Sequence, residues 1–197
     1  MATIVVPFRG SDPKQRLAVD DPARRALAEA MLADVVAAAS AVGDVVVVGP
    51  AGTSVPANVT RIPDPRRGQG AAVAAGLAAA TAAGLPAPYL VVNADLPCAG
   101  PRDLLALAGA VSGDGLALVA AADGTTNALA FADASRFEPL YGPGSAERFA
   151  ALGPSTVLDA PNLSDDVDTL DDLTRLQGRL GEHTRRVLAS LDLQSAA

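Results

Sequence analysis

Two acidic stretches of the sequence could hold a divalent metal ion. Asp95 follows the apolar run 89–92 in "YLVVNADLP", and Asp166 and Asp168 stand two residues apart in "SDDVDT". Magnesium bound to a nucleotide takes oxygen ligands, usually one or two carboxylates from the protein. Alternation along an extended segment predicts that only one of Asp166 and Asp168 faces inward. Two other roles stay open: Asp95 could form a turn or cap before Pro97, and Asp168 could cap the last helix.

A cluster of cations follows the first apolar run. Residues 9–16 read "RGSDPKQR" and include Arg9, Gly10, Arg16 and Lys14, the only lysine of the chain. Backbone amides at Gly10, together with Lys14 or Arg16, could hold phosphate groups by hydrogen bonds and charge. The alternative is an ordinary solvated surface loop.

Two glycine-containing stretches later in the chain could bind a second anion. One is "DGTTN", with Thr125 and Thr126, and the other is "YGPGSAE", with Gly142 and Ser145. The second stretch leads into a predicted helix, where the Ser145 hydroxyl can cap the helix while free amides bind the anion. A simple turn followed by a capped helix explains the same pattern.

Several common catalytic motifs are missing. The chain has no G-x-x-x-x-G-K-[ST] phosphate loop, and "GQGAAV" with Gly68 and Gly70 lacks the third glycine and does not follow a strand. His183 is the only histidine and lies in a charged helical stretch, so we interpret it as a surface residue. A Ser-His-Asp triad or a histidine metal site is therefore not expected. Any catalysis by this chain must therefore use carboxylates, cations and backbone amides.

The elements that would position these residues alternate along the chain. Apolar runs predict strands at 3–6, 45–48, 89–92, 116–121 and 126–131, and helical patterns cover 21–43, 68–84, 101–111, 145–153 and 169–191. The continuous valine runs indicate strands covered on both faces, and the alternation indicates an α/β fold with a mostly parallel sheet. Ligands of such sheets bind beyond the carboxyl ends of the strands. We expect one domain over 1–197, with a frayed tail near 191–197.

Composition narrows the class of protein. Half of the residues are apolar but only 3% are aromatic, and the net charge is -7, which argues against a general nucleic-acid binder. A single cysteine fits a reducing, cytoplasmic setting. The N-terminus shows no signal-peptide pattern, and the longest apolar run, 71–84, is too short to span a bilayer, so no membrane role is expected.

Taken together, the motifs resemble a known enzyme family. The order "KQRL", "PDPRRGQG", "VVNADLP", "GTTNAL", "GPGS" and "DVDTLDDL", spanning residues 4 to about 173, is similar to the guanylyltransferases of coenzyme F420 biosynthesis. The resemblance implies a Rossmann-like, MobA-like nucleotidyltransferase domain (GT-A-like), with a mixed, mostly parallel sheet flanked by helices. It also implies transfer of GMP from GTP to the phosphate of phosphoenolpyruvate or 2-phospho-L-lactate, with release of pyrophosphate.

The resemblance also implies roles for the candidate residues. Mg²⁺ would be held by Asp95 and Asp168. The remaining roles would be shared as follows: catalysis by Lys14, Arg16 and Asp95, nucleotide binding by Arg9, Gly10, Lys14, Gly68 and Gly70, and binding of the acid by Thr125 or Thr126, Gly142 and Ser145. The stretch 70–72, "GAA", stands where Gly-Leu-Asn is common in the family, so the residue that recognises the base is left open.

The expected partners are GTP and a small phosphorylated three-carbon acid, with no nucleic acid and no membrane. A homodimer and hand-off of the product to the next enzyme of the pathway are open expectations. Two rival functions remain. A molybdenum-cofactor guanylyl- or cytidylyltransferase usually begins with a Gly-Gly-rich loop containing Arg-Met-Gly, which "PFRGSDPKQRL" lacks. A non-catalytic nucleotide-binding module is the other, and the retained carboxylates argue against it.

Overall fold

The computed structural model describes residues 1–10, 17 and 19–191. Its strands are β1 (Ala2–Pro7), β2 (Gly43–Gly49), β3 (Thr60–Pro63), β4 (Tyr89–Val92), β5 (Leu116–Ala120), β6 (Thr126–Phe131) and β7 (Ser155–Val157). The helices are α1 (Asp21–Ser40), α2 (Gln69–Ala82), α3 (Pro101–Gly109), α4 (Ser145–Ala150), α5 (Pro161–Ser164), α6 (Leu170–Leu176) and α7 (Glu182–Ser190), with a 3₁₀ turn, η2 (Ala134–Arg136). Among these described elements, no helix combines the length and apolarity needed to cross a bilayer.

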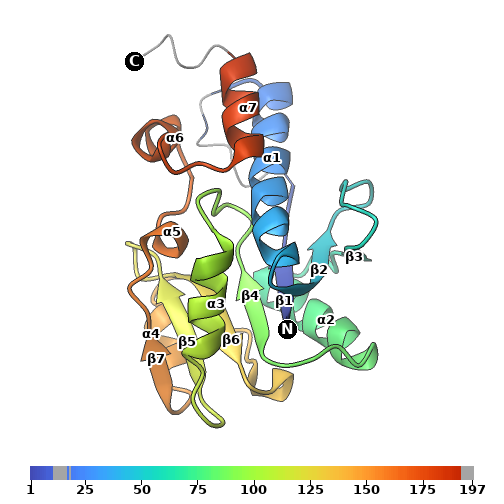
Figure 1. The fold of residues 1–197 in the computed structure, drawn as a ribbon, viewed down its shortest axis with the longest axis vertical. Helices are drawn as coiled ribbons and strands as arrows, with labels where there is room; N and C mark the ends of the chain where they lie inside the picture. The colour runs from blue at the N-terminus through green and yellow to red at the C-terminus, as the bar shows by residue number, and fades with distance from the viewer. Residues whose placement is uncertain (11–16, 18, 192–197) are drawn as a thin grey trace.

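The strands form one seven-stranded sheet in the order β3-β2-β1-β4-β6-β5-β7 (Figure 1). Strand β6 runs antiparallel to both of its neighbours, β4 and β5, and the other paired strands are parallel. The predicted mixed, mostly parallel sheet is therefore confirmed. The edge strands β3 and β7 were not predicted, because "TRIP" and "STV" are short and largely exposed.

Helices cover both faces of this sheet, as the valine runs predicted. Val45 and Val47 belong to the apolar cluster that includes residues of α1 and α3, whereas Val46 and Val48 belong to the cluster of α2 and α4. Helix α2 approaches the sheet closely at Gly76, where a Cβ atom would lie 2.4 Å from Cγ1 of Val5. Any larger residue there would push this helix away from the sheet.

A third apolar cluster lies where α6 and α7 meet the N-terminal half of α1, and Figure 1 shows α7 running beside α1. It contains Leu27 and Met31 of α1, Leu173 of α6 and Cys98 from the segment after β4. Burial raises the pKa of the Cys98 thiol above its usual value. The same cluster includes Val167, which is fully buried between two of the candidate metal ligands.

The predicted last helix, 169–191, is two helices, so that expectation was wrong. Helix α6 ends at Leu176 and α7 begins at Glu182, with Gly178 and Gly181 between them. A Cβ atom at Gly181 would lie 2.2 Å from Cγ of Asp34 on α1. Glycine at this position lets α7 begin directly against that buried side chain.

Asp34 caps α7 from another helix. Its Oδ1 accepts the backbone N–H of His183 and its Oδ2 that of Thr184, each at 2.9 Å. Free N–H groups of a helix start are usually capped by a side chain from the residues just before the helix. Here the residue before α7 is Gly181, which has no side chain, and Asp34 of α1 supplies the acceptor. The His183 side chain is exposed, which confirms its interpretation as a surface residue.

Candidate active site

Three carboxylates from two segments meet at one point. Asp95 follows β4, and Asp166 and Asp168 lie between α5 and α6. One oxygen from each can be chosen so that all three lie within 4.8 Å of one another. The backbone N–H of Val167 donates to the carbonyl of Asp95 at 3.0 Å, which joins the two segments. The group therefore offers the hard oxygen ligands that Mg²⁺ prefers.

The prediction that only one of Asp166 and Asp168 faces inward was wrong. Side chains two residues apart in an extended segment point to the same side, and the residue between them points to the other. Val167 accordingly enters the apolar cluster, while both flanking aspartates join Asp95. Three carboxylates, rather than the predicted two, can hold a cation.

The pKa of Asp166 reflects its burial beside two other carboxylates. Burial raises the pKa of Asp166, and the nearby charges of Asp95 and Asp168 raise it further. A hydrogen bond of 3.4 Å from the amide of Asn127 acts in the opposite direction. Packing negative charges together in a partly buried site is unfavourable unless a cation neutralises them. The carboxylate group therefore fits a divalent metal ion electrostatically as well as by its oxygen ligands.

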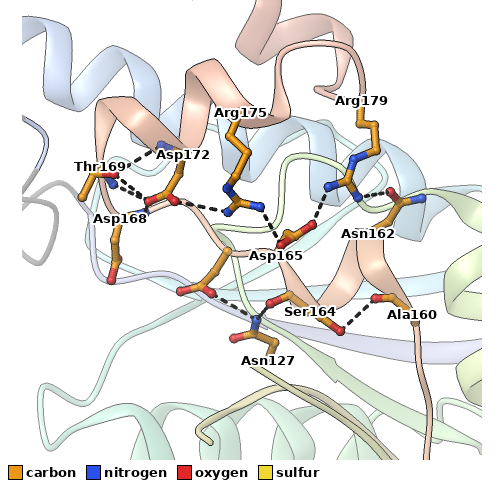
Figure 2. Close-up of polar contacts among 11 residues, drawn as sticks. Asn127, Ala160, Asn162, Ser164, Asp165, Asp168, Thr169, Asp172, Arg175 and Arg179 are labelled. Atoms are coloured by element: carbon orange, nitrogen blue, oxygen red, sulfur yellow. Dashed lines mark hydrogen bonds and ion pairs between the residues drawn. The ribbon is translucent and has the colours of Figure 1, made fainter. Parts of the chain in front are cut away.

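Two arginines of the C-terminal region hold the segment that carries this group. Asp165 lies between the guanidinium groups of Arg175, at 2.8 Å, and Arg179 (Figure 2). Burial alone would raise the pKa of Asp165, but the hydrogen bonds and charges of Arg179 and Arg175 outweigh burial and lower it. Asp165 faces these arginines, while its neighbour Asp166 faces Asp95 and Asp168.

The start of α6 fixes the other end of the segment. The N-cap is Thr169, whose hydroxyl accepts the backbone N–H of Asp172 at 3.2 Å. In return, Oδ2 of Asp172 accepts the backbone N–H of Thr169 at 2.9 Å and that of Asp168 at 3.2 Å (Figure 2). Helix capping is therefore done by Thr169 and Asp172, and the alternative cap role for the Asp168 side chain is wrong.

A cavity of about 160 Å³ adjoins the carboxylates. Its walls come from the ends of β1 and β4, from α1 and from the first residue of α2, and it includes Asp95. Arg9 and Gly10, which were predicted from the sequence to bind the nucleotide, line it. Lys14 and Arg16 lie outside the described residues.

The two glycines predicted to bind nucleotide have different surroundings. A Cβ atom at Gly68, where φ is +90°, would lie 4.0 Å from a guanidinium nitrogen of Arg9, so Gly68 faces that cation. At Gly70, a Cβ atom would lie 2.5 Å from Cβ of Pro139, so Gly70 packs against the segment after η2. The side chain that α2 contributes to the cavity is Gln69.

Two of the predicted acid-binding residues, Thr126 and Ser145, meet at the start of β6. The hydroxyl groups of Thr126 and Ser145 are 3.0 Å apart and both residues are buried. Thr125 instead donates its hydroxyl to Asp123 at 2.6 Å within its own turn. Of the two threonines that the sequence left open, Thr126 is thus the one beside Ser145. Ser145 does not cap α4, because its hydroxyl bonds Thr126 and the cap residue is Gly144, with φ at +70°.

Sequence reasoning missed the side chain that holds this loop. Arg148 of α4 donates to the backbone carbonyls of Pro143, at 2.6 Å, Leu140, at 2.8 Å, and Gly142, at 3.4 Å. These contacts fold the loop 140–144 around one guanidinium group. Because arginine is frequent in this chain, Arg148 did not stand out, although its position three residues after Ser145 was a usable signal.

Two amide side chains near the carboxylates, the half-buried Asn93 and the buried Asn127, were also missed. Asn93 precedes Asp95 by two residues, and Asn127 follows Thr126 on β6. Their side chains are hydrogen-bonded to each other at 3.4 Å, and Nδ2 of Asn127 also donates to Asp166 at 3.4 Å. Figure 2 shows Asn127 donating to the carbonyl of Ser164, at 3.0 Å. Both asparagines stand inside motifs already singled out, "VVNADLP" and "GTTNAL", so a polar residue within an apolar strand pattern was the available signal.

Comparison with known proteins places the chain among nucleotidyltransferases. The sequence profile of the MobA-like NTP transferase domain matches residues 10–191. A phosphoenolpyruvate guanylyltransferase of Roseiflexus sp. is 35% identical over 92% of this chain and 86% of its own. A 2-phospho-L-lactate guanylyltransferase of Halobacterium salinarum is 38% identical over 86% of this chain and 81% of its own.

A solved structure shares the fold. The 2-C-methyl-D-erythritol 4-phosphate cytidylyltransferase of Thermus thermophilus superimposes with a TM-score of 0.58, at 17% identity, over 90% of this chain and 98% of its own.

Proposed function

Because the chain belongs to the MobA-like NTP transferase family, we propose that it transfers GMP from GTP to the phosphate of phosphoenolpyruvate or 2-phospho-L-lactate, with release of pyrophosphate. Relatives named for these two reactions align with most of the chain at 35% and 38% identity. The observation that carries the proposal is the group of Asp95, Asp166 and Asp168, because Asp95 also lines the neighbouring cavity. The reaction belongs to the coenzyme F420 pathway that the sequence motifs implied.

Different residues would bind the two substrates, GTP and the phosphorylated acid. The phosphate of the acid is already ionised near neutral pH, so it can attack the α-phosphorus of GTP without a histidine base. Positioning and neutralisation of charge then supply most of the catalysis. We assign Arg9 and Gly10, which line the cavity, to the nucleotide together with Gly68, which faces Arg9. We assign the loop 142–145, where Ser145 bonds Thr126, to the acid. Lys14 and Arg16 would add positive charge to the triphosphate.

Asp95, Asp166 and Asp168 would hold Mg²⁺. The metal, when bound, supplies positive charge that offsets the charge on the transferring phosphoryl group. The protein's part is to hold the three oxygens in place. Three sets of contacts hold these segments in place: the backbone hydrogen bond between Val167 and Asp95, the capping bonds between Thr169 and Asp172, and the ion pairs of Asp165.

The proposal is tested by product analysis. The protein is incubated with GTP, magnesium and either phosphoenolpyruvate or 2-phospho-L-lactate, and pyrophosphate release is followed together with the mass of the products. We expect pyrophosphate in equal amount to a guanylylated acid, with at least one of the two acceptors. Glycerol phosphate, which lacks the carboxylate, serves as the matched control acceptor. Absence of pyrophosphate with both acids would contradict the proposed function.

The hydrogen-bonded hydroxyl groups of Ser145 and Thr126 give a second testable prediction. Ser145→Ala should raise the KM for the acid roughly tenfold or more, with little change in the KM for GTP. A hydrogen bond to a charged group contributes about 1.5–3 kcal/mol, which corresponds to that range. Each KM is measured with the other substrate saturating, and Ser190→Ala on the exposed face of α7 is the control.

A double variant distinguishes a direct contact of the hydroxyl groups with the acid from a role in holding the loop. Ser145→Ala or Thr126→Val alone leaves one buried hydroxyl without its partner, which costs stability, whereas removing both can be nearly neutral. We expect the double variant to regain stability but to keep the raised KM for the acid. If the KM recovers together with stability, the hydroxyls only hold the loop and do not contact the acid.

A further inference from the structure

A chain of side-chain amides runs from the cavity to the carboxylate group. Nε2 of Gln69 donates to Oδ1 of Asn93 at 2.8 Å. Nδ2 of Asn93 donates to Oδ1 of Asn127 at 3.4 Å, and Nδ2 of Asn127 donates to Oδ1 of Asp166 at 3.4 Å. Figure 2 shows the Asn127 end of this chain beside Ser164. Each amide donates in the same direction, from Gln69 toward Asp166.

Two backbone carbonyls fix that direction. Nδ2 of Asn127 also donates to the carbonyl of Ser164 at 3.0 Å, and Nδ2 of Asn93 to the carbonyl of Thr126 at 3.3 Å. A carbonyl oxygen only accepts, so neither asparagine can be turned over without placing two oxygens against each other. Oδ1 of Asn93 must therefore face Gln69, and Gln69 must present its NH₂ group to it.

This arrangement leaves the oxygen of Gln69 for a ligand. Gln69 and Asn93 both line the cavity. Within the part of the chain that the structure describes, the hydrogen bond of the Gln69 side chain is the one to Asn93, and it uses the nitrogen. Gly70, the next residue of α2, packs against Pro139 and has no side chain to offer. Oε1 of Gln69 is thus a hydrogen-bond acceptor of fixed orientation in the first turn of α2.

We propose that Oε1 of Gln69 accepts hydrogen bonds from the N1–H and 2-amino groups of guanine and so determines the choice of nucleotide. The proposal deepens the proposed function and rests on it for GTP as the donor. Guanine presents two adjacent donors at these positions, whereas the hypoxanthine of inosine keeps N1–H and lacks the amino group. A site with an oriented acceptor discriminates against a ligand that lacks the matching donor. Gln69 is then a specificity-determining residue, and Asn93 and Asn127 are positioning residues behind it.

The test compares GTP with inosine triphosphate. For the wild-type protein we expect kcat/KM to favour GTP about tenfold, the effect of one hydrogen bond in an oriented site. Gln69→Leu should bring the two nucleotides to within about twofold of each other. Gln177→Leu makes the same chemical change at an exposed residue near the end of α6 and should keep the wild-type ratio. Gln69→Met, an unbranched replacement, guards against a packing defect specific to leucine.

A binding measurement keeps this inference separate from the proposed function. Titration calorimetry with GTP and inosine triphosphate, without the acid, should show the same preference and its loss in Gln69→Leu. If wild-type protein prefers GTP in binding but yields no pyrophosphate with either acid, the proposed function fails and the inference stands.

Three results would overturn the inference. They are a wild-type protein that does not distinguish the two nucleotides, an unchanged preference in both Gln69 variants, and a Gln69→Leu variant that loses only its preference for GTP over 2′-deoxy-GTP. The last would mean that Oε1 accepts from a ribose hydroxyl.

Discussion

Asp95→Asn should lower turnover about a thousandfold and leave the fold intact. Asp95 belongs to the carboxylate group and lines the cavity. Under the proposed function, its loss would remove a ligand of Mg²⁺. Loss of the metal's charge stabilisation removes several kcal/mol from the transition state, which corresponds to a factor of this size. The measurements are steady-state turnover with saturating GTP and acid, and magnesium affinity by calorimetry.

Asp171→Asn provides the matched control for this prediction. Asp171 is exposed in the first turn of α6, three residues beyond Asp168, and lies outside the carboxylate group. Its substitution makes the same change of charge in the same region and should leave turnover within about twofold of wild type. An Asp95→Asn protein with turnover within tenfold of wild type and an unaltered response to magnesium would show that Asp95 is not a metal ligand.

Asp34→Ala should produce the largest loss of stability among the single substitutions considered. The change removes two hydrogen bonds from a buried carboxylate to the start of α7 and leaves two N–H groups without acceptors. Hydrogen bonds to charged groups contribute about 1.5–3 kcal/mol each, and the two are not additive, so we expect a loss of about 3 kcal/mol. For a chain of this size, that lowers the melting temperature by about 6–12 °C.

The expected loss is checked by thermal and urea unfolding. Glu29→Ala lies on the exposed side of the same helix and should change stability by less than about 0.5 kcal/mol. Asp34→Asn should also be strongly destabilised, because one amide oxygen cannot replace both carboxylate oxygens and its NH₂ group opposes a backbone donor. A melting temperature of Asp34→Ala within 2 °C of wild type would mean that solvent or neighbouring groups satisfy the start of α7.

The sequence predicted the regular part of this fold well, because continuous valine runs and helical spacing report burial directly. It could not predict β3 and β7, whose residues pair only at the edges of a sheet built by distant strands. The split of the last helix was missed because Gly181 depends on contact with Asp34, nearly 150 residues earlier.

The sequence singled out Asp95 from its place after an apolar strand, and the family resemblance added Asp168 as the second predicted metal ligand. The structure brings these two carboxylates together. A misapplied alternation rule allowed only one of Asp166 and Asp168 to face inward, so the presence of both in the carboxylate group was recoverable from the sequence. The pairing of Thr126 with Ser145 and the amide chain through Asn127 join residues far apart in sequence, so only the folded sheet reveals them.

Because Cys98 is buried, the reactivity of its thiol reports partial opening of the native protein. The thiol is 6% exposed and has a raised pKa, so a thiol-labelling reagent finds little reactive thiolate while the cluster under α6 and α7 stays closed. The labelling rate, measured with excess reagent, then reads the free energy of the openings that expose that cluster. Because Val167 belongs to the same cluster, this single native cysteine monitors the packing beneath Asp95, Asp166 and Asp168 without any introduced probe.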